Sequence, residues 1–521
     1  MKKILFALLI VTFINKTFAQ QAENSGLFDI DITIANAQRH LAVLTSDSLE
    51  GRETGKEGNN KAARYIARQF EQMGLKIITP NNSYFQPIVF SNEGWSDAKM
   101  IVNNDQILHQ STEFYAFPGR NPQHEDTLSV KEVIFLGYGI DDKMYSDYKN
   151  KNLKNKIILV YTGEPLNADS ISSITKTKTP SDWTTDANKK LKTAYKKGVK
   201  AVIFIDEHFD KNLRRNRARF SRNITGDVEN SDSLVTNLYI SQETAFKIFK
   251  EKNGKTTLEK YIGDKGKTKS IKLAVPVKLA LNKFLRQLKS QNVMGVIEGS
   301  DPVLKNEYVI ISAHYDHLGK QGDKIYHGAD DDGSGTTGVL CMAQAFMDAK
   351  KSEKNPKRSI LLMLVSGEEK GLLGSKFYTT YPVIPLESTV ADINIDMIGR
   401  VDDIYKTDPN YIYVIGSDKI SKDLDTIVNA ANDKYTHLKL DYTYNDEKDP
   451  NRYYYRSDHY NFAVHGIPVV FYFNGTHADY HQPTDTYDKI NFERLVKVAK
   501  LAFHTAWSVA DKAERLHIDK K

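Results

Sequence analysis

Cysteine is almost absent from this chain: Cys341 is the only one in 521 residues. A single thiol excludes an intramolecular disulfide framework. Cys341 lies in the apolar run Val339–Phe346, without a surrounding histidine-paired motif of the kind that activates a cysteine nucleophile. We interpret it as a buried structural thiol. Disulfide bonds within the chain therefore do not contribute to its stability.

Long hydrophobic runs are also missing. The most apolar segment, Ile4–Ile14, is too short to cross a bilayer. It follows Lys2 and Lys3 and precedes the small-residue stretch Thr17–Ala19, which is typical of a secretory signal peptide at residues 1–19. We therefore expect an exported protein, periplasmic or extracellular, without integral membrane association.

The chain lacks a strong net charge of either sign. Its formal charge is +6, and loss of Lys2, Lys3 and Lys16 with the signal would lower it to +3. That balance is too mild to favour nucleic acid as a partner. With 521 residues, of which 40% are hydrophobic, the chain can bury large cores and is expected to hold two or three domains.

Acidic and histidine residues do stand out, because they follow apolar runs in the second half of the chain. The runs have the continuous apolar character of buried parallel strands: Tyr308–Ala313, Ile360–Val365, Val390–Ile395 and Val469–Phe473. The residues that follow them are His314, Glu368, Glu369, Asp396 and His481. Ligands of open α/β sheets lie outside the carboxyl ends of the strands. We therefore expect these side chains to share one edge.

Two imidazoles and several carboxylates form a donor set for two adjacent cations. Zinc binds imidazole nitrogen and carboxylate oxygen at about 2.0–2.2 Å. One carboxylate can span two ions about 3.5–4 Å apart, and the run Asp330–Asp332 offers three such groups. Spacing alone does not decide which of them bridges. His477 competes with His481, since both lie in the same loop.

These segments resemble the motifs of the co-catalytic zinc aminopeptidases, a family that includes bacterial leucyl aminopeptidases, aminopeptidase Y and glutamate carboxypeptidase II. The matching segments, in chain order, are Leu49–Gly55, His314–Gly319, Gly328–Gly335, Ser366–Ser375, Asn394–Gly399 and Tyr480–Asp485. The resemblance covers nearly the whole chain after the signal.

The resemblance implies two Zn²⁺ per chain, with Asp331 as the bridge. The other implied metal ligands are His314 and Asp396 for one ion, and Glu369 and His481 for the other. Water bridging the two ions would be activated for hydrolysis of peptide substrates at their N-terminus.

Further roles follow from the same resemblance. Glu368 would act as general base, and Asp316 would support His314 from outside the metal shell. Tyr480 could donate a hydrogen bond to the developing oxyanion, or simply pack. His317 and His327 are expected at the rim of the site or behind its ligands.

The expected fold is α/β, with a mixed, mainly parallel sheet flanked by helices and a smaller β-rich α/β insert. Helical patterns run from Asn36 to Lys76 and from Phe492 to Arg515. We expect the first part of the peptidase domain at residues 20–129 and the second part, with the metal site, at residues 281–521. The segment 130–280 resembles an inserted protease-associated domain.

Other functions stay open on the sequence. A carboxypeptidase or dipeptidase on the same scaffold would need a cationic pocket, for which Arg456 is a candidate. A glutaminyl cyclase of this fold uses one metal, whereas the complete ligand set is present here. A non-catalytic binding protein would be expected to have lost a ligand or Glu368. The sequence carries no signal for an oligomeric state.

Overall fold

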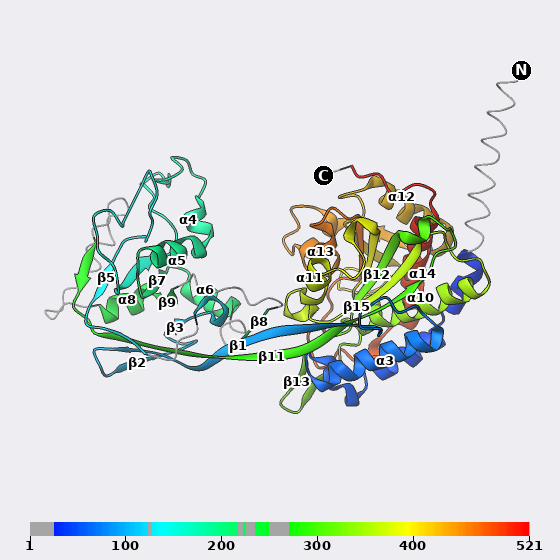
Figure 1. Ribbon diagram of the computed structural model, residues 1–521, viewed down its shortest axis with the longest axis horizontal. Coiled ribbons are helices and arrows are strands. Elements are labelled where there is room, and N and C mark those ends of the chain that lie inside the picture. The colour runs from blue at the N-terminus through cyan, green and yellow to red at the C-terminus, as the bar shows by residue number, and fades with distance from the viewer. Residues whose placement is uncertain (1–24, 123–126, 217–221, 226–234, 250–269, 520–521) are drawn as a thin grey trace, which may run out of the picture. The chain divides into compact units, whose positions relative to one another are not determined.

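The computed structural model describes residues 25–122, 127–216, 222–225, 235–249 and 270–519 (Figure 1). The expected signal peptide, residues 1–19, lies outside them. The chain divides into two compact units. Unit 1 comprises Met1–Val89 and Leu288–Lys521, and unit 2 comprises Phe90–Gln287. No helix among the described residues combines the length and apolar character needed to cross a membrane.

Unit 1 is built on a mixed sheet whose centre is parallel. Its strand order begins with β18 (Lys439–Asp441), β17 (Tyr411–Ile415), β19 (Val469–Phe473), β16 (Thr389–Ile395), β12 (Tyr308–His314), β15 (Ser359–Val365) and β11 (Val277–Ile297). The sheet continues through β1 (Phe85–Val102) and β2 (Gln106–His109). Strand β12 pairs in parallel with β15 and β16, and β16 with β19. Strands β11 and β17 run antiparallel to their neighbours β15 and β19. The mixed, mainly parallel sheet confirms the expected fold class.

Helices cover both faces of this sheet (Figure 1). One face packs against α2 (Ile34–Leu44), α3 (Glu57–Met73), α10 (Gly333–Lys351) and α14 (Phe492–Asp511). The other packs against α11 (Leu373–Thr380) and α13 (His459–Ala463). Successive side chains of β12 point to opposite faces of the sheet. Val309 and Ile311 therefore belong to the apolar cluster on the first face, and Ile310 belongs to the cluster on the second. Unit 1 also contains α12 (Lys422–Ala431), whose Leu424, Val428 and Ala431 belong to the same apolar cluster as α14, and a hairpin of β13 (Gly319–Gln321) and β14 (Lys324–Tyr326).

The N-terminal helical pattern is interrupted. Between α2 and α3 lies a short 3-10 segment, Asp47–Arg52, in which Glu50 and Gly51 have φ of 48° and 68°. The single pattern expected from Asn36 to Lys76 is therefore two helices. The second ends as expected, since Gly74 takes a left-handed conformation with φ of 88°.

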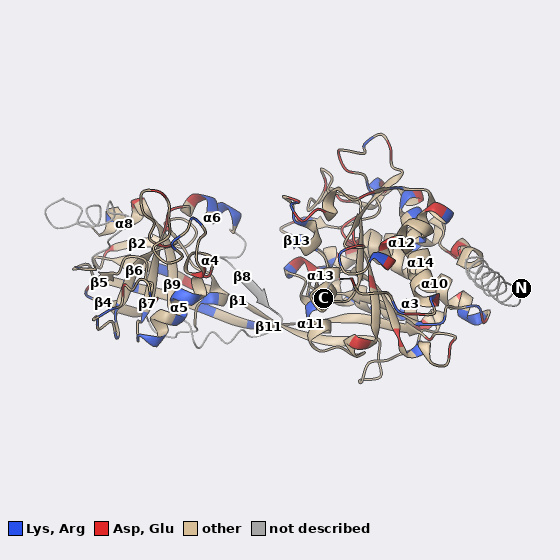
Figure 2. Ribbon diagram, turned by 90° about the horizontal axis from the view of Figure 1, so that it is seen from above, with Lys and Arg blue, Asp and Glu red and all other residues tan. Residues whose placement is uncertain are grey.

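Unit 2 has a second sheet and its own apolar cores. The strand order is β10 (Ile271–Leu273), β5 (Val133–Phe135), β6 (Ile157–Tyr161), β7 (Ala201–Asp206), β9 (Thr236–Ser241) and β3 (Phe114–Tyr115). Strands β5, β6, β7 and β9 pair in parallel. The other elements are β1 (Phe85–Val102), β2 (Gln106–His109), β4 (Leu128–Val130), β8 (Arg222–Thr225), α4 (Asp182–Thr185), α5 (Ala187–Lys196), α6 (Phe209–Arg215) and α8 (Gln242–Ile248). Lysines gather on α5 (Figure 2).

Unit 2 begins before the insert expected from residue 130. Met100, Leu108 and Phe114 are buried in its core, which places the boundary at Phe90. It ends at Gln287 rather than residue 280. Strands β1 and β11 each contain residues of both units, and such long strands have no turn residue that marks a boundary.

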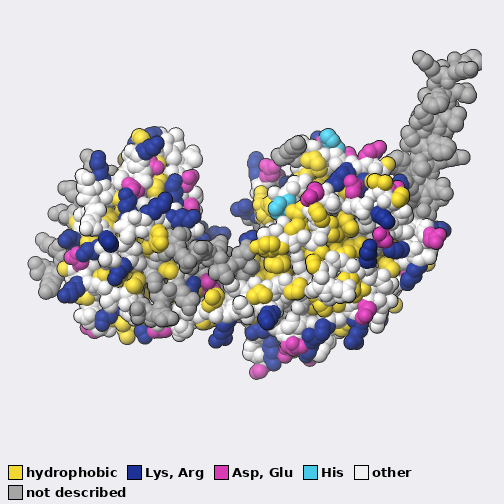
Figure 3. All heavy atoms as spheres, in the orientation of Figure 1, with side chains coloured by type: hydrophobic (Ala, Val, Ile, Leu, Met, Phe, Trp, Pro, Cys, Tyr) yellow, Lys and Arg dark blue, Asp and Glu magenta, His cyan; other side chains and the backbone are white. Residues whose placement is uncertain are grey.

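Apolar side chains also reach the surface of unit 1 in the view of Figure 3. Among the described residues of unit 1, Tyr381 and Val464 are each 56% exposed. More than half of a folded protein's accessible surface is ordinarily apolar. These side chains therefore need no functional explanation.

Candidate metal centre

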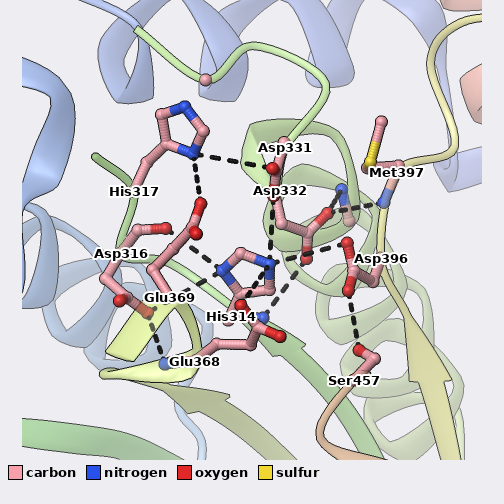
Figure 4. A network of polar contacts seen from close by, with 12 residues as sticks. His314, Asp316, His317, Asp331, Asp332, Glu368, Glu369, Asp396, Met397 and Ser457 are labelled. Carbon is pink, nitrogen blue, oxygen red and sulfur yellow. Dashed lines mark hydrogen bonds and ion pairs between the residues drawn. The ribbon is translucent and has the colours of Figure 1, made fainter. Parts of the chain in front are cut away.

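The candidate site lies at the carboxyl ends of the parallel strands. His314 is the last residue of β12, Glu368 and Glu369 follow β15, and Asp396 follows β16. Asp331 lies in the turn that leads into α10, and His481 lies in the loop after β19. Figure 4 shows the side chains of His314, Asp331, Glu368, Glu369 and Asp396 gathered in one place. The structure thus brings together the residues predicted from the four apolar runs.

His314 forms a cluster with two carboxylates. Its Nε2 atom lies 3.3 Å from Oδ1 of Asp331 and 3.5 Å from Oδ1 of Asp396. Ligand atoms that share a tetrahedral zinc ion at about 2.0–2.2 Å are about 3.3–3.6 Å apart, which these separations match. His314 Nε2 is buried and has no hydrogen-bond partner among the described residues. These three side chains could therefore hold an ion.

A second cluster shares Asp331. Nε2 of His481 lies 3.0 Å from Oδ2 of Asp331 and 3.3 Å from Oε2 of Glu369. Within the described part of the chain, the buried Oε1 atom of Glu369 has no hydrogen-bond partner. The two oxygens of Asp331 therefore face different imidazoles, as a bridging carboxylate requires.

The two residues next to Asp331 in sequence, Asp330 and Asp332, make hydrogen bonds outside the two clusters. Asp330 accepts hydrogen bonds from the backbone N–H of Gly399 (2.6 Å) and from Ser334. Asp332 caps α10 by accepting from the backbone N–H of Gly335, and it also accepts from that of Met397. These contacts make both carboxylates structural, which leaves Asp331 as the member of the triplet that faces both clusters.

His477 is not part of either cluster. Its Nε2 atom lies 3.2 Å from Oδ2 of Asp330. His481, by contrast, contacts both Asp331 and Glu369. Geometry thus favours His481 in the choice that the sequence left open. His327 lies at the edge, 2.8 Å from Asp47.

Asp316 supports the site through several contacts. Its carboxylate accepts from the hydroxyl of Thr54 (2.7 Å) and from the backbone N–H of Glu368 (3.2 Å). Its backbone carbonyl oxygen lies 3.1 Å from Nδ1 of His314, whereas its carboxylate is 3.8 Å away. The carbonyl, rather than the expected carboxylate, is therefore the closer acceptor for His314 Nδ1–H.

Glu368 lies beside the first cluster without joining it. Its Oε2 atom is 3.9 Å from Nε2 of His314. Burial holds the pKa of Glu368 well above the ordinary range, and the negative charges of Asp396 and Glu369 add to the rise. A carboxylate in this position can exchange a proton with a group bound between the clusters.

Tyr480 lies at the opening of the site. Its ring stacks on His481 with centroids 3.9 Å apart, and its hydroxyl accepts a hydrogen bond from Arg456 at 3.3 Å. Burial raises the pKa of Tyr480, so its hydroxyl keeps its proton. A small cavity of about 30 Å³ opens here, lined by Asp331, Glu368, Asp396, Met397, Tyr453, Arg456, Phe471, Phe473, Thr476 and Tyr480.

Sequence reasoning missed a serine that orients Asp396. Ser457 donates to Oδ2 of Asp396 at 2.7 Å and accepts from the side chain of Asn394 at 2.8 Å. This leaves Oδ1 of Asp396 directed at His314 (Figure 4). The neighbouring Arg456 drew attention to this loop, but no spacing pattern pointed to Ser457.

Sequence reasoning also left the segment Leu49–Gly55 without a role. Arg52 is fully buried there. Its guanidinium donates to the carbonyl oxygens of Leu44 (2.6 Å), Tyr315 (2.8 Å), His327 (2.6 Å) and Gly328 (2.9 Å). Arg52 thereby joins the loop after His314 to the loop before Asp331.

Comparison with known proteins gives this geometry a context. Residues 292–506 match the model of peptidase family M28. A probable leucine aminopeptidase of Arthroderma otae is 27% identical over 236 residues, which cover 44% of this chain and 60% of that protein. Aminopeptidase Y of Saccharomyces cerevisiae is 26% identical over 249 residues, which cover 45% of this chain and 42% of that protein. The chain thus spans about half the length of these relatives.

The solved structure of an aminopeptidase from Aneurinibacillus sp. strain AM-1 shares the fold. It aligns with a TM-score of 0.56 at 21% identity, over 95% of this chain and 98% of that one. The two clusters described above lie within the segment that matches the family. Over residues 292–506, which contain both clusters, the chain is therefore similar to peptidase family M28.

Proposed function

We propose that this protein is an aminopeptidase that uses two zinc ions per chain to remove N-terminal residues from peptides. The observation that carries the proposal is the pair of imidazole–carboxylate clusters that share Asp331. The ligands would be His314 and Asp396 for one ion, Glu369 and His481 for the other, and Asp331 for both. When bound, such ions would supply an activated water and polarise the scissile carbonyl.

The chain's own residues then have distinct tasks. Glu368, with its raised pKa, takes the proton of the attacking water and passes it to the leaving amine. Tyr480, whose hydroxyl keeps its proton, donates a hydrogen bond to the developing oxyanion. Asp316 holds Glu368 in place through the backbone N–H of that residue.

The cavity beside the site supports binding of an apolar first residue. Met397, Phe471 and Phe473 line it next to Glu368 and Asp396. Burial of such a side chain against these walls contributes about 25 cal/mol per Å² of apolar surface. We therefore propose a preference for apolar N-terminal residues.

One observation favours a second candidate, a carboxypeptidase or dipeptidase. Arg456 lines the same cavity, where its guanidinium donates to the hydroxyl of Tyr480. A guanidinium in this position could bind a substrate carboxylate.

Peptide hydrolysis separates the two. We expect release of the first residue from peptides with a free N-terminus and none from their N-acetylated counterparts. The same peptides with an amidated C-terminus serve as the matched control and should be cleaved equally well. Cleavage that survives acetylation but stops on amidation would favour the carboxypeptidase, and no cleavage at all would favour a binding protein.

We also propose that the chain is exported and that unit 2 is a protease-associated domain, on the grounds of the N-terminal pattern and the resemblance described above. N-terminal sequencing of the protein recovered from its own cells should begin at Gln20. A chain that begins at Met1 would contradict export.

A further inference from the structure

A row of polar residues crosses the second face of the sheet in unit 1, which is otherwise apolar and packs against α11 and α13. Asp392 and Asn394 alternate along β16 with apolar residues of the first face, and Asp396 continues the row. On the neighbouring strand β12, Ser312 lies opposite Asn394. Asp392, Asn394 and Ser312 are fully buried. Polar side chains buried in this way need hydrogen-bond partners.

These side chains form a continuous chain of hydrogen bonds that ends at Asp396. Oδ1 of Asp392 lies 2.7 Å from Oγ of Ser312, which lies 2.9 Å from Oδ1 of Asn394. Nδ2 of Asn394 lies 2.8 Å from Oγ of Ser457. The last contact, 2.7 Å between Ser457 and Oδ2 of Asp396, is shown in Figure 4. All four separations are hydrogen-bond distances, so each contact contains one hydrogen.

The direction of these hydrogen bonds follows from the metal end of the chain. A carboxylate that binds a cation is ionised and can only accept. Ser457 therefore donates its one hydroxyl hydrogen to Asp396 and accepts from the NH₂ group of Asn394. The carbonyl oxygen of Asn394 then faces Ser312 and accepts the hydroxyl hydrogen of that serine.

The contact between Ser312 and Asp392 must then obtain its hydrogen from Asp392. We propose that Asp392 is a neutral carboxylic acid, which donates to Ser312 and keeps the hydroxyl hydrogen of that serine directed at Asn394. This assignment rests on the proposed function, in which Asp396 binds zinc. Asp392 is a positioning residue, because it acts on Asp396 only through the groups between them.

The surroundings of Asp392 favour its neutral form. Oδ2 of Asp392 is buried and has no hydrogen-bond partner among the described residues. Burial raises the pKa of Asp392 well above its ordinary value against the effect of its hydrogen bond with Ser312, and the carboxylate of Asp458 before α13 adds to the rise. Burial also raises the pKa of Tyr378 of α11, another titratable neighbour, so its hydroxyl keeps its proton. An ionised Asp392 would be a costly buried charge.

Infrared spectroscopy of the zinc-loaded protein tests the protonation state directly. Asp392→Asn has nearly the same shape and can also donate to Ser312. We expect the difference spectrum at neutral pH to show the C=O stretch of a protonated carboxylic acid in the wild type that the variant lacks. If the asparagine variant does not fold, Asp392→Leu serves for the same comparison.

The infrared result and the zinc content separate the two proposals. A wild-type protein that binds zinc but lacks this band would overturn the inference and leave the proposed function intact. A wild-type protein that binds no zinc would count against both.

The pH dependence of stability gives a second readout. An acid that is neutral in the folded state and ionised in the unfolded state takes up a proton on folding, so its contribution to stability is lost as the pH rises. The folding equilibrium constant of the wild type, relative to that of Asp392→Asn, should therefore fall about tenfold per pH unit near neutrality. Denaturant titration of both proteins measures this ratio. An unchanged ratio would contradict a neutral Asp392.

Zinc affinity tests the positioning role. Ser312→Ala removes the hydrogen that reaches Asn394, whereas Asp392→Asn keeps it. We expect Ser312→Ala to bind one ion about 10-fold more weakly, the lower end of what groups outside the metal shell contribute, and Asp392→Asn to bind as the wild type does. Competition with a chelator measures both. Equal affinities in the two variants would contradict the positioning role.

Discussion

Asp331 is central to the site because its two oxygens face different imidazoles. Oδ1 is 3.3 Å from His314 Nε2, and Oδ2 is 3.0 Å from His481 Nε2. Asp330 and Asp332 use their oxygens to accept backbone hydrogen bonds instead. Three adjacent residues of one type thus have different environments, and residue type alone could not separate them.

Substitution of Glu368 tests its role as the base. Glu368→Gln keeps the shape of the side chain but removes its capacity to take a proton. We expect peptide hydrolysis to fall by about 10²–10⁴-fold, while the metal content stays at the wild-type level because Glu368 belongs to neither cluster. Steady-state kinetics with metal analysis measures both quantities. Activity at the wild-type rate would show that the base lies elsewhere.

Ser457 should affect metal binding without touching the ion. Ser457→Ala removes the hydrogen bond to Oδ2 of Asp396 and lets that carboxylate turn. We expect the affinity of one of the two ions to fall about 10–100-fold, measured by competition with a chelator. Ser421→Ala is the matched control, because the hydroxyl of Ser421 is buried and has no hydrogen-bond partner among the described residues. Equal affinities in both variants would contradict the role of Ser457.

Individual residues were predictable only where a pattern marked them. His314, Asp396 and Glu369 follow apolar strands, and the strand ends predicted their shared position. The hydrogen bonds of Ser457 and Arg52 join residues more than sixty and 260 positions apart in sequence. No local pattern predicts such contacts, because they arise only when the chain is folded.

At the scale of elements, the apolar runs predicted the central strands closely. Strand β12 covers Tyr308–His314 and β19 covers Val469–Phe473, within one residue of the expected ranges. These strands are buried on both faces, so their sequence is continuously apolar. The break between α2 and α3 was missed because helical periodicity continues on both sides of it.

The loop segment that holds Arg52 should be important for stability. Arg52→Lys replaces a guanidinium that donates to four carbonyl oxygens with a shorter group that has three donors. We expect the free energy of unfolding to fall by about 2–4 kcal/mol, since buried acceptors lose their partners. Denaturant titration measures this loss.

Arg64→Lys is the matched control. Arg64 pairs with Glu57 on the surface, with 59% of its side chain exposed. Surface ion pairs contribute little, so the unfolding free energy should change by less than about 0.5 kcal/mol. If Arg52→Lys were no more destabilised than this control, Arg52 would not hold the two loops together.

At the scale of the whole molecule, the proposed metal ligands all lie in unit 1, and each unit has separate apolar cores. At a free zinc concentration 100-fold above the dissociation constant, binding raises the free energy of unfolding of the unit that binds zinc by about 2.7 kcal/mol. A chelator should therefore speed hydrogen exchange in β12 of unit 1 and leave β7 of unit 2 unchanged. Hydrogen exchange of the intact chain, followed by proteolysis and mass spectrometry of the fragments, measures both. Equal acceleration in β12 and β7 would contradict a metal site confined to unit 1.

The division into units was harder to predict than the central strands. The expected insert began at residue 130, but unit 2 already includes the buried residues Met100 and Leu108. Long strands such as β11, Val277–Ile297, have residues in both units and lack turn signals at the boundary. Local sequence patterns therefore predict where a strand or helix lies better than they predict which unit it packs in.

The most direct test of the account is the metal content of the wild-type protein and of Asp331→Ala. Both clusters depend on the carboxylate of Asp331. We expect about two zinc ions per wild-type chain and a large loss of both ions from a folded Asp331→Ala protein. A wild-type chain that binds no zinc, or an Asp331→Ala chain that retains both ions, would contradict a metal centre built around Asp331.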